Sequence, residues 1–292
     1  MTRGLKYRLF VIVCCVLGAA SGAKGEQPPA PSVKTYKQNF FLHGKDSKEH
    51  SDGRESEETQ FQISLKFQPF DDFPLYLGYT QKSFWQMYDS DRSRPFRENN
   101  FNPEGFFDWY FPGNETDFAL QLGAEHESNG RGFEFDASEN RNLNKSRSWN
   151  RIYLHPKLKF EGQLSLALKL WHRIEEDEKA GEDDPDGDDN PDIEKFLGHG
   201  ELRLATSAGN GNYQFLSMIR KGRWDPHGTI QLDFLLNPDW LKDAGRWFSK
   251  GMYIQLHYFN GFGESLIDYD RRVKKVGIGF AAGNPFASMF PR

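Results

Sequence analysis

Residues 118–130 read Phe-Ala-Leu-Gln-Leu-Gly-Ala-Glu-His-Glu-Ser-Asn-Gly, and the alternation in this stretch predicts the fold. Side chains of a β-strand alternate between two faces, so every second residue shares a face. A strand of a membrane β-barrel turns its apolar face to lipid and its polar face to the lumen. We therefore expect the face that ends in a histidine and a serine to lie against lipid. That face carries Phe118, Leu120, Leu122, Ala124, His126 and Ser128, and the opposite face carries Asp117, Ala119, Gln121, Gly123, Glu125 and Glu127.

The same alternation recurs along the chain, and turn residues separate its segments. It predicts about twelve strands, and bacterial membrane barrels contain an even number of strands. The sequence therefore predicts an all-β fold, namely a twelve-stranded antiparallel transmembrane β-barrel. The expected strands are 34–42, 59–68, 74–87, 101–111, 117–128, 149–160, 163–173, 197–207, 212–221, 228–236, 251–260 and 273–282.

Short and long connections alternate between these strands, as expected for a barrel with short inner turns and long outer loops. With the N-terminus inside, Ser128 ends an outward-running strand, so the pair His126 and Ser128 lies near the outer leaflet. The connection 237–250 is long although it lies on the inner side, and a short helix would account for it. The short inner turns are Glu161-Gly162 and Ala208–Gly211, and the long outer loops are 44–58, 88–100, 129–148, 174–196 and 261–272.

The stretch 175–194 in one of the outer loops is almost continuously acidic. It does not match an EF-hand calcium loop, because Gly187 does not stand at the required sixth position after Asp184. We interpret this stretch as a solvated outer loop.

The first 25 residues have the pattern of a secretory signal peptide, in which basic residues precede the short apolar stretch Leu9–Ala20. We expect residues 1–25 to be removed and residues 26–292 to form a single barrel domain. Both cysteines, Cys14 and Cys15, lie in the signal, so the mature chain has no thiol for disulfides, catalysis or metal binding. Removal of the signal takes four of the 37 basic residues and none of the 42 acidic ones, which leaves a net charge of −9. This charge argues against nucleic-acid binding.

A second strand brings an amide to the same patch as His126 and Ser128. Strand 149–160 should pair with strand 117–128 as a hairpin, and its lipid-facing set begins with Asn150. A serine hydroxyl is a weak nucleophile without a base, and His126 can take its proton. The amide oxygen of Asn150 can hold the imidazole in the required tautomer. A neutral amide suits this position, because an unpaired carboxylate facing lipid would cost several kcal/mol.

These residues resemble the signature of the outer-membrane phospholipase A family. The resemblance begins with His126-Glu-Ser-Asn-Gly-Arg131 and Ser146-Arg-Ser-Trp-Asn-Arg151. It extends over most of the mature chain, from about residue 60 to Phe286. An insertion around 132–143 and an expanded acidic loop depart from the family pattern. The further matching stretches are Tyr79-Thr-Gln-Lys-Ser83, Pro95-Phe-Arg-Glu98, Asp188-Asp-Asn-Pro-Asp-Ile193 and Gly263-Glu-Ser-Leu-Ile-Asp-Tyr269.

The resemblance implies a calcium-dependent acyl hydrolase that is active as a homodimer. Ser128 resembles the nucleophile, His126 the base and Asn150 the orienting residue, and the backbone of Gly130 would complete the oxyanion hole with calcium. The resemblance also implies a Ca²⁺ ion at the dimer interface and a polar contact between the subunits within the membrane. The matching calcium ligands are the backbone carbonyl of Arg131 and Ser146 of one subunit and Ser93 of the other, and Gln81 matches the polar contact.

We therefore predict an enzyme of the Gram-negative outer membrane that hydrolyses acyl esters of glycerophospholipids and lysophospholipids, with its site towards the outer leaflet. Its activities would be those of a phospholipase A1, a phospholipase A2 and a lysophospholipase. A lipid A deacylase barrel, which also uses a histidine and a serine, is an alternative. A passive porin or structural barrel is a second alternative, but a pore gains nothing from polar groups that face lipid.

Overall fold

The computed structural model describes residues 33–47, 54–136, 141–161, 163–181, 184, 187–223, 227–245 and 251–283. The expected signal peptide, residues 1–25, lies outside the described residues. All the strands among the described residues lie in the unit Val33–Arg292. Its fold can therefore be described by itself.

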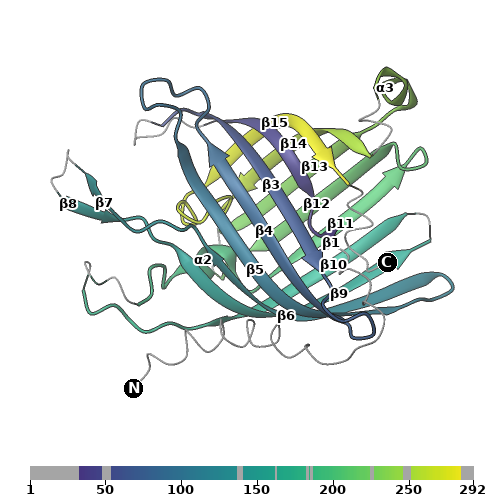
Figure 1. Cartoon of the computed structure of the whole chain (residues 1–292), viewed down its shortest axis with the longest axis horizontal. Coiled ribbons are helices and arrows are strands. Elements are labelled where there is room, and N and C mark those ends of the chain that lie inside the picture. The colour runs from purple at the N-terminus through teal and green to yellow at the C-terminus, as the bar shows by residue number, and fades with distance from the viewer. Residues whose placement is uncertain are drawn as a thin grey trace, which may run out of the picture. The chain divides into compact units, whose positions relative to one another are not determined.

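Twelve antiparallel strand positions form a closed barrel (Figure 1). The strands are β2 (Asn39–Asp46), β3 (Glu57–Phe67), β4 (Leu75–Trp85), β5 (Phe96–Phe111), β6 (Thr116–Ser128), β9 (Ser148–Phe160), β10 (Leu164–Ile174), β11 (Gly200–Ala208), β12 (Tyr213–Lys221), β13 (Gly228–Leu236), β14 (Met252–Gly261) and β15 (Val273–Ala282). Each strand pairs with its neighbours in this series, and β15 pairs with β2 to close the barrel. The predicted twelve-stranded antiparallel barrel is confirmed.

The two faces of the strands differ as predicted. On β6, the exposed fraction is 48% for Leu122 but 1% for Gln121 and 5% for Glu125. On β9, Ile152 is 48% exposed and Arg151 is 8% exposed. The apolar side chains therefore point outwards, where lipid replaces water, and the polar side chains point into the lumen.

Ion pairs lie among the side chains that face the lumen of the barrel. Nε of Arg151 lies 3.2 Å and Nζ of Lys169 lies 2.8 Å from Oε1 of Glu125. Nζ of Lys37 lies 2.7 Å from Oε1 of Glu104. Cavities of about 210 Å³ and 280 Å³ remain among the lumenal side chains. Pairing of this kind compensates the cost of burying these charges.

The first strand position differs from its prediction, because the expected strand 34–42 is divided. A short strand, β1 (Val33–Thr35), pairs with the end of β3, and β2 pairs with the rest of β3. Side chains replace the backbone ladder at the break. The Lys37 N–H donates to Oγ of Ser64 at 3.1 Å, and the Ser64 N–H donates to Oδ1 of Asn39 at 2.5 Å.

Strand β5 also differs, since it begins at Phe96 whereas the prediction began at residue 101. Its first inward positions are occupied by Glu98, Asn100 and Asn102, which are 1%, 5% and 7% exposed. Buried polar residues at these positions hide the hydrophobic alternation on which the prediction depended. The predicted outer loop 88–100 is correspondingly shorter.

The connections contain structure that the alternation did not predict. Strands β7 (Phe133–Asp136) and β8 (Arg141–Asn144) form a separate hairpin within the outer loop 129–148. The acidic loop contains helix α2 (Ile193–Leu197). Its interpretation as solvated is wrong at its far end, because Asn190 and Ile193 are fully buried.

Helix α3 (Asp239–Ala244) lies in the long inner connection 237–250, where a short helix was expected. Among the described residues, no helix has the length and hydrophobicity needed to span a membrane.

Candidate active site

His126 and Asn150 face each other directly across β6 and β9. Nδ1 of His126 lies 2.9 Å from Oδ1 of Asn150. The other amide atom of Asn150, Nδ2, donates to Oε1 of Glu176 at 2.9 Å. A carboxylate only accepts hydrogen bonds, so Glu176 determines that the amide oxygen faces the imidazole. Nδ1 of His126 is then the donor, and Nε2 is left as the basic nitrogen.

Ser128 ends β6 on the same face as His126. Residues i and i+2 of a strand are about 7 Å apart along its axis, so rotation of the two side chains can bring the hydroxyl towards the imidazole. Within the part of the chain that the structure describes, the Ser128 hydroxyl makes no hydrogen bond. Catalytic hydrogen bonds are often formed only in the substrate complex.

The lumenal residues on the same strands show which way this site faces. Glu125 and Glu127 alternate with His126 and Ser128 on β6, and both pair with Arg151, which adjoins Asn150 on β9. Glu125, Glu127 and Arg151 all line a lumenal cavity. The candidate catalytic side chains have the opposite parity and lie on the outer wall. They therefore lie where the sequence analysis placed them.

Gly130 stands two residues beyond the candidate nucleophile, in a left-handed backbone conformation with φ 62°. A Cβ atom at this position would lie 2.9 Å from Cε2 of Phe101. Both the backbone conformation and the aromatic ring therefore favour glycine here. The Gly130 N–H has no hydrogen-bond partner within the described residues, so it is available to an external acceptor.

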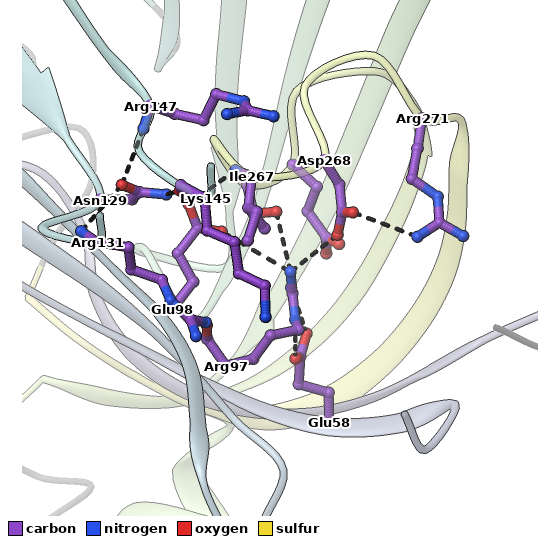
Figure 2. A network of polar contacts seen from close by, with 12 residues as sticks. Glu58, Arg97, Glu98, Asn129, Arg131, Lys145, Arg147, Ile267, Asp268 and Arg271 are labelled. Carbon is purple, nitrogen blue, oxygen red and sulfur yellow. Dashed lines mark hydrogen bonds and ion pairs between the residues drawn. The ribbon is translucent and has the colours of Figure 1, made fainter. Parts of the chain in front are cut away.

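Asn129 holds together the two ends of the outer loop that follows β6 (Figure 2). This side chain is 2% exposed, and its Oδ1 accepts from the backbone N–H of Arg131 at 3.2 Å and of Arg147 at 3.0 Å. Its Nδ2 donates to the carbonyl of Lys145 at 2.8 Å. The backbone N–H of Lys145 in turn donates to the carbonyl of Gly132 at 3.0 Å. We call this set of contacts the loop neck.

The loop neck explains how the chain accommodates its insertion. The β7–β8 hairpin lies beyond the neck, so the extra residues extend outwards and leave the two ends of the loop close together. Arg131 and Ser146, the two expected calcium ligands of one subunit, flank this neck. The structure therefore brings both segments to the same place despite the insertion.

Oxygen atoms that could serve a hard cation gather beside Ser146. Asn144 connects Ser146 to Asp189, because its Oδ1 accepts from the Ser146 N–H at 2.9 Å and its Nδ2 donates to Oδ1 of Asp189 at 2.8 Å. Partial burial disfavours the charged form of Asp189. Hydrogen bonds from Lys179, Ser146 and Asn144 nevertheless hold the pKa of Asp189 below its usual value, so that it is a carboxylate at neutral pH.

The kind of donor at this place decides which metal could bind. The described residues include no group of three or more histidine, cysteine and acidic side chains that could hold a metal. Carbonyl, hydroxyl and single carboxylate oxygens, together with water, are ligands that Ca²⁺ accepts. The donors here therefore fit calcium better than a transition metal.

The other two expected interface residues lie on β4 and in the turn that follows it. Ser93 is exposed and has a left-handed backbone conformation with φ 61°. Gln81 lies on the outer face of β4, where its Nε2 donates to Oγ of Ser83 at 3.1 Å and its Oε1 accepts from Oη of Tyr79 at 3.3 Å. Within the described chain, neither residue forms a hydrogen bond with His126 or Asn150.

The register of the strands nevertheless relates Gln81 to the candidate nucleophile. Gln81 lies opposite Phe101 on β5, and Phe101 lies opposite Ser128 on β6. Strands are spaced by about 4.8 Å, so Gln81 and Ser128 lie roughly 10 Å apart along this row. A surface formed around Gln81 would therefore adjoin the candidate active site.

Glu176 and Asn129 are contacts that the sequence analysis missed. Glu176 belonged to an acidic run that was interpreted as solvated. The alternation could have indicated its contact with Asn150. Glu176 continues the outer face of β10 beyond Ile174, and Ile174 lies opposite Asn150. The role of Asn129 in the loop neck had no comparable signal.

The chain is similar to known proteins over most of its length. The family model described as phospholipase A1 matches residues 30–282. The phospholipase A1 of Escherichia coli K12 is 30% identical over 246 residues, which cover 79% of this chain and 71% of that relative. The phospholipase A1 of Proteus vulgaris is 29% identical over 263 residues, covering 86% and 78%.

Solved structures of outer membrane phospholipases also match this chain. The outer membrane phospholipase A of Escherichia coli matches with a TM-score of 0.69 and 25% identity, covering 87% of this chain and 99% of that one. The Salmonella typhi outer membrane phospholipase, a dimer with bound calcium, matches with a TM-score of 0.70 and 25% identity, covering 89% and 95%.

Proposed function

The chain belongs to the phospholipase A1 family of outer-membrane β-barrel hydrolases, and from this membership we propose a calcium-dependent enzyme with Ser128, His126 and Asn150 as its catalytic residues. It acts on acyl esters of glycerophospholipids and of lysophospholipids. The observation that carries the proposal is the hydrogen bond between His126 and Asn150, which lies beside Ser128 on the lipid-facing wall.

The residues of the chain can perform acyl transfer in two stages. Nε2 of His126 accepts the hydroxyl proton as Oγ of Ser128 attacks the ester carbonyl carbon, and the Gly130 N–H donates to the developing oxyanion. The carbon–oxygen ester bond breaks, and His126 returns the proton to the leaving glycerol oxygen. Water then attacks the acyl group on Ser128 with His126 again as the base, which releases a fatty acid and restores the serine.

Calcium would add a positive charge beside the oxyanion, which is Lewis-acid assistance to the same step. The Arg131 carbonyl and the Ser146 hydroxyl of one subunit, and Ser93 of the partner subunit, would hold the ion. The carboxylate of Asp189 lies in the same neighbourhood, where it is paired with Lys179. The solved Salmonella typhi relative is a dimer with bound calcium, which supports the same arrangement here.

A homodimer through the outer surface around Gln81 would place the second subunit next to Ser128. A monomer would lack one calcium ligand, and its oxyanion hole would be incomplete. Dimerisation would then control activity and would protect the cell's own membrane from constant hydrolysis. The register that relates Gln81, Phe101 and Ser128 supports this proposal.

The test is hydrolysis of a diacyl phospholipid by the refolded barrel in detergent micelles, with calcium and with excess chelator. We expect hydrolysis that requires calcium and is abolished by Ser128→Ala, while Ser148→Ala, which changes the residue opposite it on β9, remains active. Retained activity in Ser128→Ala would refute the proposal. Preferential cleavage of lipid A, or ion conductance without ester cleavage, would support the two alternatives that family membership disfavours.

A further inference from the structure

Glu176 lies two residues beyond the end of β10. It continues the outward-facing set of that strand, because it has the same parity as Ile174, which lies opposite Asn150. The side chain therefore reaches the lipid-facing site from the residues that follow β10, the third strand of this group after β6 and β9. It is half-buried, whereas its neighbour Glu175 is exposed.

The contacts form a linear chain of hydrogen bonds. Oε1 of Glu176 accepts from Nδ2 of Asn150 at 2.9 Å, and Oδ1 of Asn150 lies 2.9 Å from Nδ1 of His126. A carboxylate that accepts from one end of an amide polarises it, and the amide oxygen becomes a better acceptor at the other end. The same carboxylate prevents the amide from turning its nitrogen towards His126, because that would place oxygen against oxygen.

The other charged groups around His126 face away from it. Glu125 and Glu127 on β6 and Arg151 on β9 point into the lumen and pair with one another. On the β5 side, Asn102 donates to the His126 carbonyl at 2.9 Å and carries no charge. Among the described contacts of the outer face, Glu176 is thus the charged group connected to the imidazole.

We propose that Glu176 is a positioning residue that acts on His126 through Asn150, which rests on the function proposed above. It supplies the fixed negative charge that an aspartate supplies directly in a serine–histidine–aspartate triad. The charge stands one residue further from the nucleophile, where the strand end meets water. In the proposed steps the proton moves only between Ser128, Nε2 of His126 and the leaving oxygen.

The first test compares Glu176→Ala and Glu176→Gln with the exposed control Glu175→Gln, all as refolded full-length protein with saturating calcium. We expect kcat to fall roughly tenfold in Glu176→Ala with little change in KM, and the control to match the wild type. Glu176→Gln keeps an acceptor for Asn150 but loses the charge, so it should recover part of the kcat. Heat-modifiable migration on gels shows that each variant has folded.

The pH dependence separates a charge effect from a structural one. A carboxylate favours the protonated imidazolium, which is inactive as a base. Its removal in Glu176→Gln should therefore move the acid limb of the kcat/KM profile to lower pH. A residue that only anchored the acidic loop would leave this limb unchanged.

A second pair of variants tests the proposal by a gain of activity, so that it does not depend only on a fall in kcat. Asn150→Asp places a carboxylate against Glu176, and like charges at this distance repel. We expect Asn150→Asp to be more active in the Glu176→Gln background than alone. Equal kcat and an unshifted acid limb in Glu176→Ala and Glu176→Gln, with Ser128→Ala inactive, would overturn this inference alone. Activity in Ser128→Ala would instead overturn the proposed function.

Discussion

Nδ1 of His126 and Oδ1 of Asn150 lie 2.9 Å apart on directly paired residues of β6 and β9. The backbone ladder of the barrel thus sets the distance between the two groups, and no mobile loop is needed to bring them together. A strand pair is a rigid support for catalytic groups.

Asn150→Ala should lower kcat roughly 10- to 100-fold, because an imidazole without its orienting partner loses part of the rate that a general base supplies. The loss should be smaller than in Ser128→Ala, in which the nucleophile itself is removed. Steady-state hydrolysis of a micellar phospholipid measures both. Asn260→Ala on β14, a strand that is not adjacent to β6 or β9, serves as the control. Unchanged kcat in Asn150→Ala would contradict the assignment.

Gly130→Ala should lower kcat roughly 10²- to 10³-fold, the usual cost of losing one oxyanion donor. The added Cβ would lie 2.9 Å from Cε2 of Phe101, and the left-handed backbone disfavours alanine, so the N–H must move. Gly132→Ala is a matched control, because a Cβ there meets nothing within 4 Å. Equal activity of the two variants would exclude a role of the Gly130 N–H.

Asn129→Ala should raise the calcium concentration for half-maximal activity, roughly tenfold. The variant leaves the N–H groups of Arg131 and Arg147 without their acceptor, so the two sides of the loop neck are no longer held together. Asn129→Asp keeps this acceptor but loses the donor to Lys145, and it should show an intermediate effect.

Calcium titrations of hydrolysis, followed by chemical cross-linking of the dimer, measure the effect of Asn129. Activity that returns at saturating calcium distinguishes a weakened site from a misfolded barrel. A calcium response identical to that of the wild type would show that the loop neck does not support the metal.

Asp268→Asn should destabilise the barrel at neutral pH but not in acid. Asp268 lies in an outer loop, where its Oδ2 is 2.8 Å from Nη1 of Arg97 and 2.5 Å from Nη1 of Arg54 (Figure 2 shows the Arg97 contact). Burial disfavours the charged form, but the guanidinium groups of Arg97, Arg54 and Arg271 outweigh this and hold the pKa of Asp268 below its usual value.

The sign of the pH dependence follows from this lowered pKa. The stabilisation is fully present above the unfolded value of about 3.9 and is lost as the pH falls through the lower folded value. We expect a difference of about 3 kcal/mol between wild type and Asp268→Asn at pH 7, which disappears in strong acid. Urea unfolding of the refolded proteins at several pH values measures it. A difference that persists in strong acid would mean that packing, not charge, is responsible.

The two-residue alternation of apolar and polar side chains was sufficient to predict the strands of the barrel and which face each side chain lies on. The alternation placed His126, Ser128 and Asn150 on one wall. It gave the strand bounds closely except at β5, at the divided first strand and at the start of β11, where Leu197 ends helix α2. It failed at β5 because the inward residues Glu98 and Asn100 are polar and buried.

The outer loops could not be predicted in this way, because their contacts join segments that are distant in the chain. The bond of Glu176 to Asn150 spans 26 residues, and the loop neck closes only when both ends of the loop have been placed by β6 and β9. No local pattern records such contacts. The β7–β8 hairpin within the insertion was likewise not predicted from the sequence.

The ion pairs of Glu125 and Glu127 with Arg151 have a consequence for the fate of the acyl group. These ion pairs line the lumenal side of β6 and β9, and the same strands carry the nucleophile on their outer side. The barrel wall therefore separates lumenal water from the reacting ester. The second reactant must arrive along the bilayer boundary. An alcohol that partitions into that boundary should compete with water there, and the enzyme would then make esters as well as fatty acids.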